Sequence, residues 1–369
     1  MIRGFGRRIA RCTLRASIVL AWLGTAEGAP PQGTPLLITL PPEVLASAVG
    51  ANGFVVAGNL YSGGAFHWMP TSGVTRIGGI SVGDVSRDGK TIVGQEADTR
   101  GLENAAVWTG GRSWRLLGAL GPNARPCDHL LSSAHGTSED GRVVVGLAWD
   151  GCSYARAFRW EESTGMVDLG SLADGDRSTR ADGVSGDGRV VVGWEEAASG
   201  FRQGAKWVDG HEELIEGPAG VVGEARAANR DGSLIVGMSC QPVGGLVRPA
   251  AWTWRQGVGV TCFPVERPAW VPPFPYSVLM SATSDDGRVI GGALTFGLDA
   301  ESVVWFDGEP VFLRDYLREH GIPDAFEGWI NTGFITGISP DGRTLAGYGA
   351  GPSTFQGFIV VLPELGARE

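Results

Sequence analysis

Lysine is almost absent from this sequence of 369 residues, in which Lys90 and Lys206 are the two examples. The 30 basic residues are therefore nearly all arginine, and they are outnumbered by 40 acidic residues, which gives a formal net charge of −10 at pH 7. Nucleic acids and anionic lipid surfaces bind to concentrated positive fields, which a chain of this charge does not offer. We therefore expect no nucleic-acid partner.

Several short signals of catalytic or metal centres are missing as well. The sequence has no Cys-x-x-Cys and no His-x-x-x-His, and its five histidines are scattered along the chain. These two spacings are typical of zinc sites and metalloproteases. We accordingly assign no catalytic residue, no metal ligand and no cofactor from the sequence.

The sequence also lacks an N-terminal apolar run long enough to span a membrane. The run that is present, Ala16–Leu23, is too short to cross a bilayer as a helix. Five arginines precede this run and small residues follow it up to Ala29, which is the order of a secretory signal peptide. The sequence thus predicts a signal peptide over residues 1–29, cleaved near 26–29. It predicts an exported protein, periplasmic or extracellular, with a mature charge of about −15 and no membrane span after cleavage.

Four cysteines remain after this cleavage: Cys127, Cys152, Cys240 and Cys262. An even number in an exported chain indicates disulfides, and the pairing that closes local loops joins Cys127 to Cys152 and Cys240 to Cys262. A metal site is the alternative. Zinc sites have stereotyped ligand spacings, and here His129 is the single histidine near a cysteine.

The most informative positive feature is a repeat in which Asp-Gly or Asn-Gly is followed by a second glycine six residues after the Asp or Asn. The seven copies start at Asn52, Asp88, Asp140, Asp187, Asp231, Asp286 and Asp341. Residues 181–216 show one unit clearly, as four short runs of β-branched and aromatic residues separated by turn residues. Four antiparallel strands per unit are the content of one propeller blade.

The repeated Asp-Gly step supplies the left-handed backbone conformation of a tight hairpin turn, and a Ser or Asn two residues earlier can hydrogen-bond across that turn. Calcium ligands or catalytic carboxylates are the functional alternative for these acids. A group that occurs at the same turn in every unit is far more typical of a scaffold.

A tryptophan marks the third strand of six units, with Val360 at the corresponding place of the seventh. These residues are Trp68, Trp108, Trp160, Trp207, Trp254 and Trp305. A platform for stacking sugars is one interpretation. Regular occurrence in each unit favours core packing between neighbouring blades.

The two ends of the repeat region predict how the architecture closes. The last unit lacks a fourth strand, whereas Thr34–Leu40 forms a strand without a blade of its own. We therefore expect an all-β, seven-bladed β-propeller of four-stranded antiparallel blades, closed by the N-terminal strand that completes the last blade. It forms a single domain over residues 34–362 with a C-terminal tail over 363–369, and we expect a monomer. Leu313–Gly321 predicts a short amphipathic helix outside the sixth blade.

Function is expected on the rim opposite the Asp-Gly turns, where the loops between second and third strands vary. The candidate ligand-binding residues are Tyr61, Asp98, Arg100, Trp149, Asp150, Glu195, Glu196, Arg202 and Arg248. Their mixture of charges and aromatics suits a saccharide or a peptide or protein ligand, which predicts a binding module. The alternative is an envelope glycan hydrolase or lyase that pairs Glu195 with Asp98 or Asp150.

The repeat also resembles a known family. Ser138–Gly146 followed by Ala157–Trp160, together with Gly165–Leu172 and Gly337–Arg343, is similar to the HAF repeats of bacterial extracellular proteins. The resemblance covers roughly residues 45 to 362. It implies export, and because the family has no established common activity it implies no catalytic residues.

Overall fold

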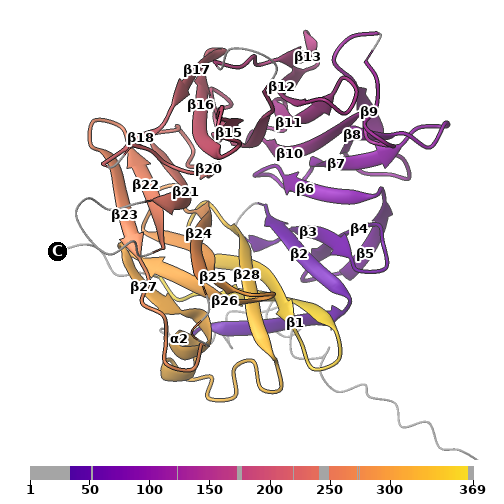
Figure 1. Cartoon of the computed structure of the whole chain (residues 1–369). Helices are drawn as coiled ribbons and strands as arrows, with labels where there is room; N and C mark the ends of the chain where they lie inside the picture. The colour runs from indigo at the N-terminus through magenta and orange to yellow at the C-terminus, as the bar shows by residue number, and fades with distance from the viewer. Residues whose placement is uncertain are drawn as a thin grey trace, which may run out of the picture.

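The computed structural model describes residues 34–50, 53–122, 124–172, 177–218, 220–240, 249–271, 273 and 275–364. The predicted signal peptide lies outside these residues, as does Arg248. The described part is almost entirely β-structure, and its sheets stand side by side around a common centre (Figure 1).

Most strands belong to four-stranded antiparallel sheets made of consecutive strands, which confirms the predicted unit. The first two sheets contain β2 (Val44–Val49), β3 (Val56–Leu60), β4 (Ala65–Met69) and β5 (Gly73–Gly78), then β6 (Ser81–Val85), β7 (Ile92–Ala97), β8 (Glu103–Trp108) and β9 (Arg115–Gly118). The next two contain β10 (Ser132–Thr137), β11 (Val144–Trp149), β12 (Ala155–Glu161) and β13 (Gly165–Asp168), then β14 (Thr179–Val184), β15 (Val190–Glu196), β16 (Arg202–Val208) and β17 (His211–Leu214). The short hairpin of β18 (Glu216–Gly217) and β19 (Gly220–Val221) follows.

Two further units share one larger sheet because β21 and β24 pair at Met238 and Leu279. Their strands are β20 (Ala225–Ala228), β21 (Leu234–Cys240), β22 (Ala250–Arg255) and β23 (Gly259–Pro264), then β24 (Tyr276–Thr283), β25 (Val289–Phe296), β26 (Asp299–Phe306) and β27 (Glu309–Phe312).

The last sheet combines the two ends of the described chain. Its strand order is β1 (Leu36–Pro42), β30 (Phe355–Val361), β29 (Thr344–Ala350) and β28 (Asn331–Ile338). β1 pairs antiparallel with β30, with Leu36 opposite Val361. The N-terminal strand therefore lies in the sheet formed by the C-terminal strands.

The same three local hydrogen bonds hold the Asp-Gly turns at Asp88, Asp140, Asp187, Asp286 and Asp341. In the second unit the Ser86 hydroxyl donates to the Asp88 carboxylate (2.7 Å) and accepts from the Thr91 N–H (3.0 Å), while the Asp88 carboxylate accepts from the Lys90 N–H (3.0 Å). Gly89 has a φ of 69°, a left-handed conformation that glycine adopts without strain. These acids are therefore scaffold residues, as the repeat predicts.

The second repeated glycine is required for a different reason. It lies against a β-bulge in the first strand of its unit, where the two backbones approach closely. In the fourth unit the register shifts between Ala181 and Gly183, opposite Gly193. A Cβ on Gly193 would lie 1.9 Å from the Arg180 carbonyl oxygen. Across the corresponding glycines 58, 94, 146, 193, 237, 292 and 347 this distance is 1.9–2.3 Å, so a side chain is excluded by close approach.

The hydrophobic core lies between neighbouring sheets and includes most of the repeated tryptophans. Trp207 is 1% exposed and Trp305 is fully buried, while Trp254 is partly exposed. Buried residues of one sheet pack on those of the next, as Ala48 of β2 does in the same cluster as Val82 and Trp108 of the following sheet. The prediction that these tryptophans pack in the core is thus confirmed.

Two smaller predictions are also confirmed. Cys127 pairs with Cys152 and Cys240 with Cys262, with Cα atoms 4.5 and 5.7 Å apart. The helix α2 (Leu313–Glu319) buries Leu313 and Leu317 and contacts β26 and β27.

We expect Gly193→Ala to lower the free energy of unfolding by about 3 kcal/mol, because the bulged strand must move to admit the methyl group. Gly200→Ala is the control, since Gly200 has a φ of 81° and open space around it, and should cost only about 1 kcal/mol. Denaturant unfolding measures both values. Equal losses would contradict the steric role of Gly193.

Candidate functional site

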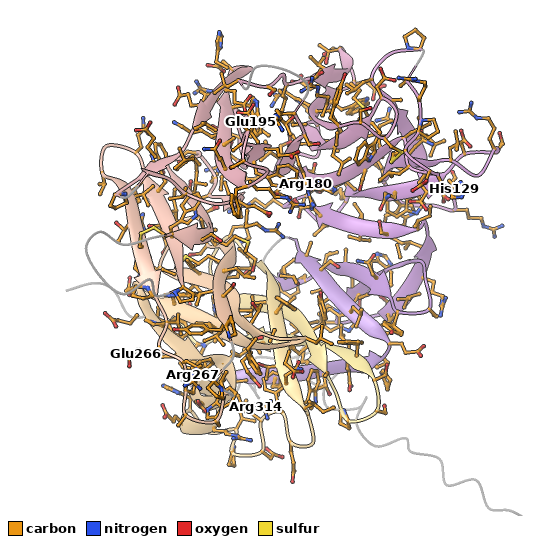
Figure 2. The ribbon with its side chains drawn as sticks, in the orientation of Figure 1. His129, Arg180, Glu195, Glu266, Arg267 and Arg314 are labelled. Carbon is orange, nitrogen blue, oxygen red and sulfur yellow. A yellow bond between two sulfur atoms is a disulfide. The ribbon has the colours of Figure 1, made fainter. Side chains whose placement is uncertain are left out.

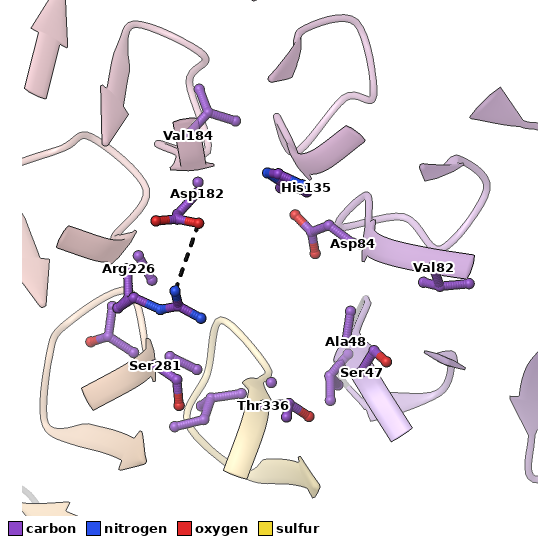
Figure 3. Close-up of a pocket in the computed structure, with 18 of the residues that line it drawn as sticks. Ser47, Ala48, Val82, Asp84, His135, Asp182, Val184, Arg226, Ser281 and Thr336 are labelled. Carbon is purple, nitrogen blue, oxygen red and sulfur yellow. Dashed lines mark ion pairs between the residues drawn. The ribbon is translucent and has the colours of Figure 1, made fainter. Parts of the chain in front are cut away.

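The β-bulges aim one residue of each unit toward the common centre of the sheets. These residues are Ser47, Gly83, His135, Asp182, Arg226, Ser281 and Thr336. All of them line a central cavity of about 520 Å³. Figure 3 labels the six of them that have side chains around this cavity, which is therefore built by a position of the first strand that differs between units.

Three of these side chains connect neighbouring sheets. The hydroxyl of Ser281 donates to the Ile335 carbonyl, and that of Thr336 donates to the Ala46 carbonyl (3.0 Å). His135 makes the corresponding contact from Nδ1 to the Ala181 carbonyl (2.9 Å). The single O–H donor of each hydroxyl is thus used in a hydrogen bond between neighbouring sheets.

The charged residues form a chain of alternating sign along one wall. Asp182 lies 2.7 Å from Arg180 and 3.7 Å from Arg226, and Arg226 lies 3.2 Å from Glu224. Glu224 in turn lies 2.6 Å from Arg202, whose guanidinium stacks over Trp194 at 4.3 Å. Figure 3 shows the contact between Asp182 and Arg226, and Figure 2 places Arg180 near the centre of the molecule.

His135 is neutral in this site. Burial is the main reason that its pKa falls to about 3, and the positive charges of Arg180 and Arg226 lower it further. A carbonyl oxygen can only accept, so the bond to Ala181 places the ring proton on Nδ1. Nε2 is therefore left as a hydrogen-bond acceptor.

Burial raises the pKa of Asp182, and Asp84 is the other cavity carboxyl with a raised pKa. Burial raises its pKa to about 6, although its carboxylate accepts from the N–H groups of Thr137 (3.0 Å) and Val85 (2.8 Å). Other units hold alanine or glycine at this position, as Ala48 and Gly183 show. Asp84 adds a carboxylate beside Gly83, which has no side chain of its own.

An ion cluster crosses the centre at the side of the Asp-Gly turns. Arg87 bonds Glu139 of the next unit and also Asp285 (2.9 Å), although three sheets separate Arg87 from Asp285 in chain order. Arg230 lies 3.2 Å from Glu139 and completes the cluster. Each member precedes the Asp of an Asp-Gly turn, so the turns that hold the scaffold also bring these charges together.

Of the sequence-predicted ligand residues that the structure describes, none lines the central cavity. Asp98 forms an ion pair with Arg100 in its own loop (2.8 Å), and Asp150 pairs with Arg125 (3.3 Å). Tyr61 is 59% exposed and packs on Phe355 with ring centroids 5.6 Å apart.

The remaining predicted residues lie on β11, β15 and β16. Trp149 ends β11, and Glu196 of β15 lies opposite Arg202 of β16. Arg202 reaches the wall of the cavity through Glu224. It is thus the predicted residue that the structure connects to this site.

Glu195 is buried rather than presented to solvent, and it accepts a hydrogen bond from Ser171. Figure 2 shows it farther from the centre than Arg180. Burial of nearby Glu212 raises the pKa of that residue to about 8, and the negative charge of Glu195 raises it further. Glu212 is therefore mainly protonated at neutral pH.

Sequence reasoning did not identify the bulge residues, although a signal exists. Each lies five positions before the Asp or Asn of the turn, as His135 does before Asp140 and Asp182 before Asp187. This position varies inside an otherwise regular unit. A residue that varies within a constant scaffold is a candidate for function.

Within the described ranges, no group of three or more His, Cys, Asp or Glu side chains could hold a metal ion. A search of the same residues finds no helix of sufficient length and apolarity to cross a membrane.

No protein-family model matches the sequence, and neither does any curated protein. Among solved structures, the chain is similar to the β-propeller domain of Cps50 (Swd1) from Myceliophteria thermophila, with a TM-score of 0.53, 12% identity and coverage of 89% of this chain and 99% of that one. A prolyl endopeptidase gives a TM-score of 0.51 at 11% identity, over 90% of this chain and 51% of the other. TolB from Acinetobacter baumannii gives 0.44 at 11% identity, over 77% and 64%. The fold is therefore that of a β-propeller.

His135 and Asp84 predict opposite effects of pH on stability. The pKa of His135 is lower in the folded protein than its ordinary 6.5, so the free energy of unfolding decreases as pH falls from 6.5 toward 3. The pKa of Asp84 is higher than its ordinary 3.8, so the free energy of unfolding decreases as pH rises from 3.8 to 6. Each slope is up to about 1.4 kcal/mol per pH unit, and between pH 4 and 6 they oppose each other.

Removing either group should expose the slope of the other. Relative to the wild type, His135→Asn should make stability fall more steeply with rising pH, and Asp84→Asn should make it rise more steeply. The free energy of unfolding at pH points from 3 to 7 measures these differences. Curves parallel to that of the wild type would show that neither group has a shifted pKa.

Proposed function

We propose that this chain is an exported binding module, a propeller of seven blades that receives its ligand in the central cavity. The observation that carries this proposal is the convergence of the bulge residues on one cavity of about 520 Å³, which lies within the range of small-ligand sites. The ligand enters from the rim opposite the Asp-Gly turns, since the ion cluster of Arg87, Glu139, Arg230 and Asp285 crosses the other end.

The count of seven blades and their closure are part of the proposal. The seven copies of the repeat support the count. Closure is supported by the pairing of β1 with β30, and by a core cluster in which Leu40 and Ile359 pack with Val56 and Phe66 of the first sheet. A closed ring leaves no open sheet edge between its first and last blades.

A glycan hydrolase or lyase that uses the variable loops receives no such support. Asp98 and Asp150 are each paired with an arginine near their own loop, and Glu195 is buried beside Ser171. A carboxylate pair for glycoside cleavage needs two groups on either side of one bond. We therefore propose binding as the function.

Filling the cavity tests the proposal. Ala228 lines the cavity, so Ala228→Phe should abolish the ligand-induced rise in melting temperature in a thermal-shift screen of saccharides, amino acids and short peptides. Val258→Phe, at a surface position that is 75% exposed, is the matched control and should respond like the wild type. Binding that survives in a folded Ala228→Phe protein would place the ligand elsewhere.

Export belongs to the same proposal and is supported by the N-terminal residues and by the two disulfides. Membership of the HAF-repeat proteins also belongs to it and is supported by repeat residues such as Ser138–Gly146. Intact mass of the protein from a periplasmic extract should show loss of the first 26 to 29 residues. Reduction should then add two hydrogens per disulfide. A full-length mass, or no change on reduction, would contradict export.

A further inference from the structure

We propose that the ligand of the central cavity is a small carboxylate whose neighbouring groups donate hydrogen bonds, with its carboxylate on Arg180 and Arg226 and its donors on Asp84 and His135. This inference rests on the proposed function and assigns the chemical class of the ligand.

The two arginines have more donors than the protein uses. Asp182 lies between them and contacts both through the same oxygen, Oδ1, at 2.7 and 3.7 Å. Each guanidinium has five N–H donors. The side chains of Arg180 and Arg226 line the cavity and are 29% and 32% exposed, respectively. A guanidinium with free donors is best matched by a planar carboxylate, which it can bind through two parallel hydrogen bonds.

The neighbouring wall offers acceptors. His135 is neutral with its proton on Nδ1, so Nε2 can only accept. Each oxygen of Asp84 accepts one backbone N–H, and an ionised carboxylate has about four acceptor sites. A group with O–H or N–H donors next to the ligand carboxylate fits this pair.

The opposite wall is less polar. Leu45, Val49 and Ile338 line it, and the hydroxyls of Ser281 and Thr336 already donate to neighbouring sheets. The carbon skeleton of the ligand therefore packs on this side. The cavity is thus polarised, with its charged groups confined to strands β6, β10, β14 and β20.

Two kinds of compound share this chemistry: amino carboxylates, such as short peptides, and hydroxy carboxylates, such as uronic acids. Asp84 distinguishes them, because an ammonium group pairs with its ionised form whereas a second anion is repelled by it. The titratable and charged groups that line the cavity with Asp84 are His135, Arg180, Asp182, Arg226 and Tyr348. Of these, the arginines stay charged at every pH of interest.

The test is calorimetric titration of the whole protein with matched pairs of compounds. Alanyl-alanine is compared with its C-terminal amide, and glucuronate with glucose. We expect the carboxylate member of one pair to bind at least tenfold more tightly than its neutral partner. Affinity for the peptide should weaken below pH 6, and affinity for the uronate should improve below pH 6 with proton uptake. In Asp84→Asn this dependence on pH should become clearly weaker, and what remains should come from Asp182, whose pKa burial also raises; an unchanged dependence would contradict the placement of the ligand donor on Asp84.

Arg226→Lys keeps the charge beside Asp182 and Glu224 but loses the planar fork, and should weaken binding about tenfold. Arg100→Gln, in an exposed loop pair, is the control and should leave affinity unchanged. If Arg226→Lys unfolds, Arg180→Lys replaces it in the same titration.

The outcomes separate the two proposals. Equal affinity for a carboxylate and its neutral partner, or wild-type affinity in both arginine variants, would overturn the carboxylate assignment while leaving the cavity as a binding site. If the Ala228→Phe protein binds as well as the wild type, the proposed function itself fails. No binding by any of these compounds would overturn the carboxylate assignment.

Discussion

The close approach of two strands at one point in every unit governs the rest of this propeller. At the β-bulge, the first strand carries one residue more than its partner, and its backbone presses on a glycine of the second strand at a distance that leaves no room for a Cβ atom. The extra residue turns toward the centre of the molecule. The same geometry thus permits tight sheets and supplies a set of side chains, such as Asp182 and Arg226, that face the cavity.

Buried charges are costly unless they are paired, and the site reflects this cost. Arg180, Asp182, Arg226 and Glu224 alternate in sign, so each charge lies beside an opposite one. A second set of paired charges crosses the centre between Arg87 and Asp285. Arginine donors and the acceptor Nε2 of His135 remain on the cavity wall, and the proposed binding site rests on these groups.

The turns, strands and core positions could be predicted from the sequence because each depends on local residue requirements that repeat from unit to unit. The Asp88-Gly89 turn needs a left-handed backbone and a side chain that caps it, and both requirements appear as residue types at constant spacing. The four-stranded sheets, the buried tryptophans such as Trp207, and the cysteine pairs follow from the same kind of pattern. In the variable loops, Asp98 and Asp150 pair with nearby arginines, and their role in ligand binding stays a prediction.

The sequence by itself determined the unit, its turns and its core faces, because each depends on contacts within one hairpin or one strand. The tertiary structure decided which variable residues meet. Arg87 and Asp285 are separated by 198 positions, and Asp84 and His135 belong to different units, yet the arrangement of the sheets brings them to one centre. Periodicity cannot show such a meeting, because a side chain at a bulge changes direction only when the neighbouring strand is in place.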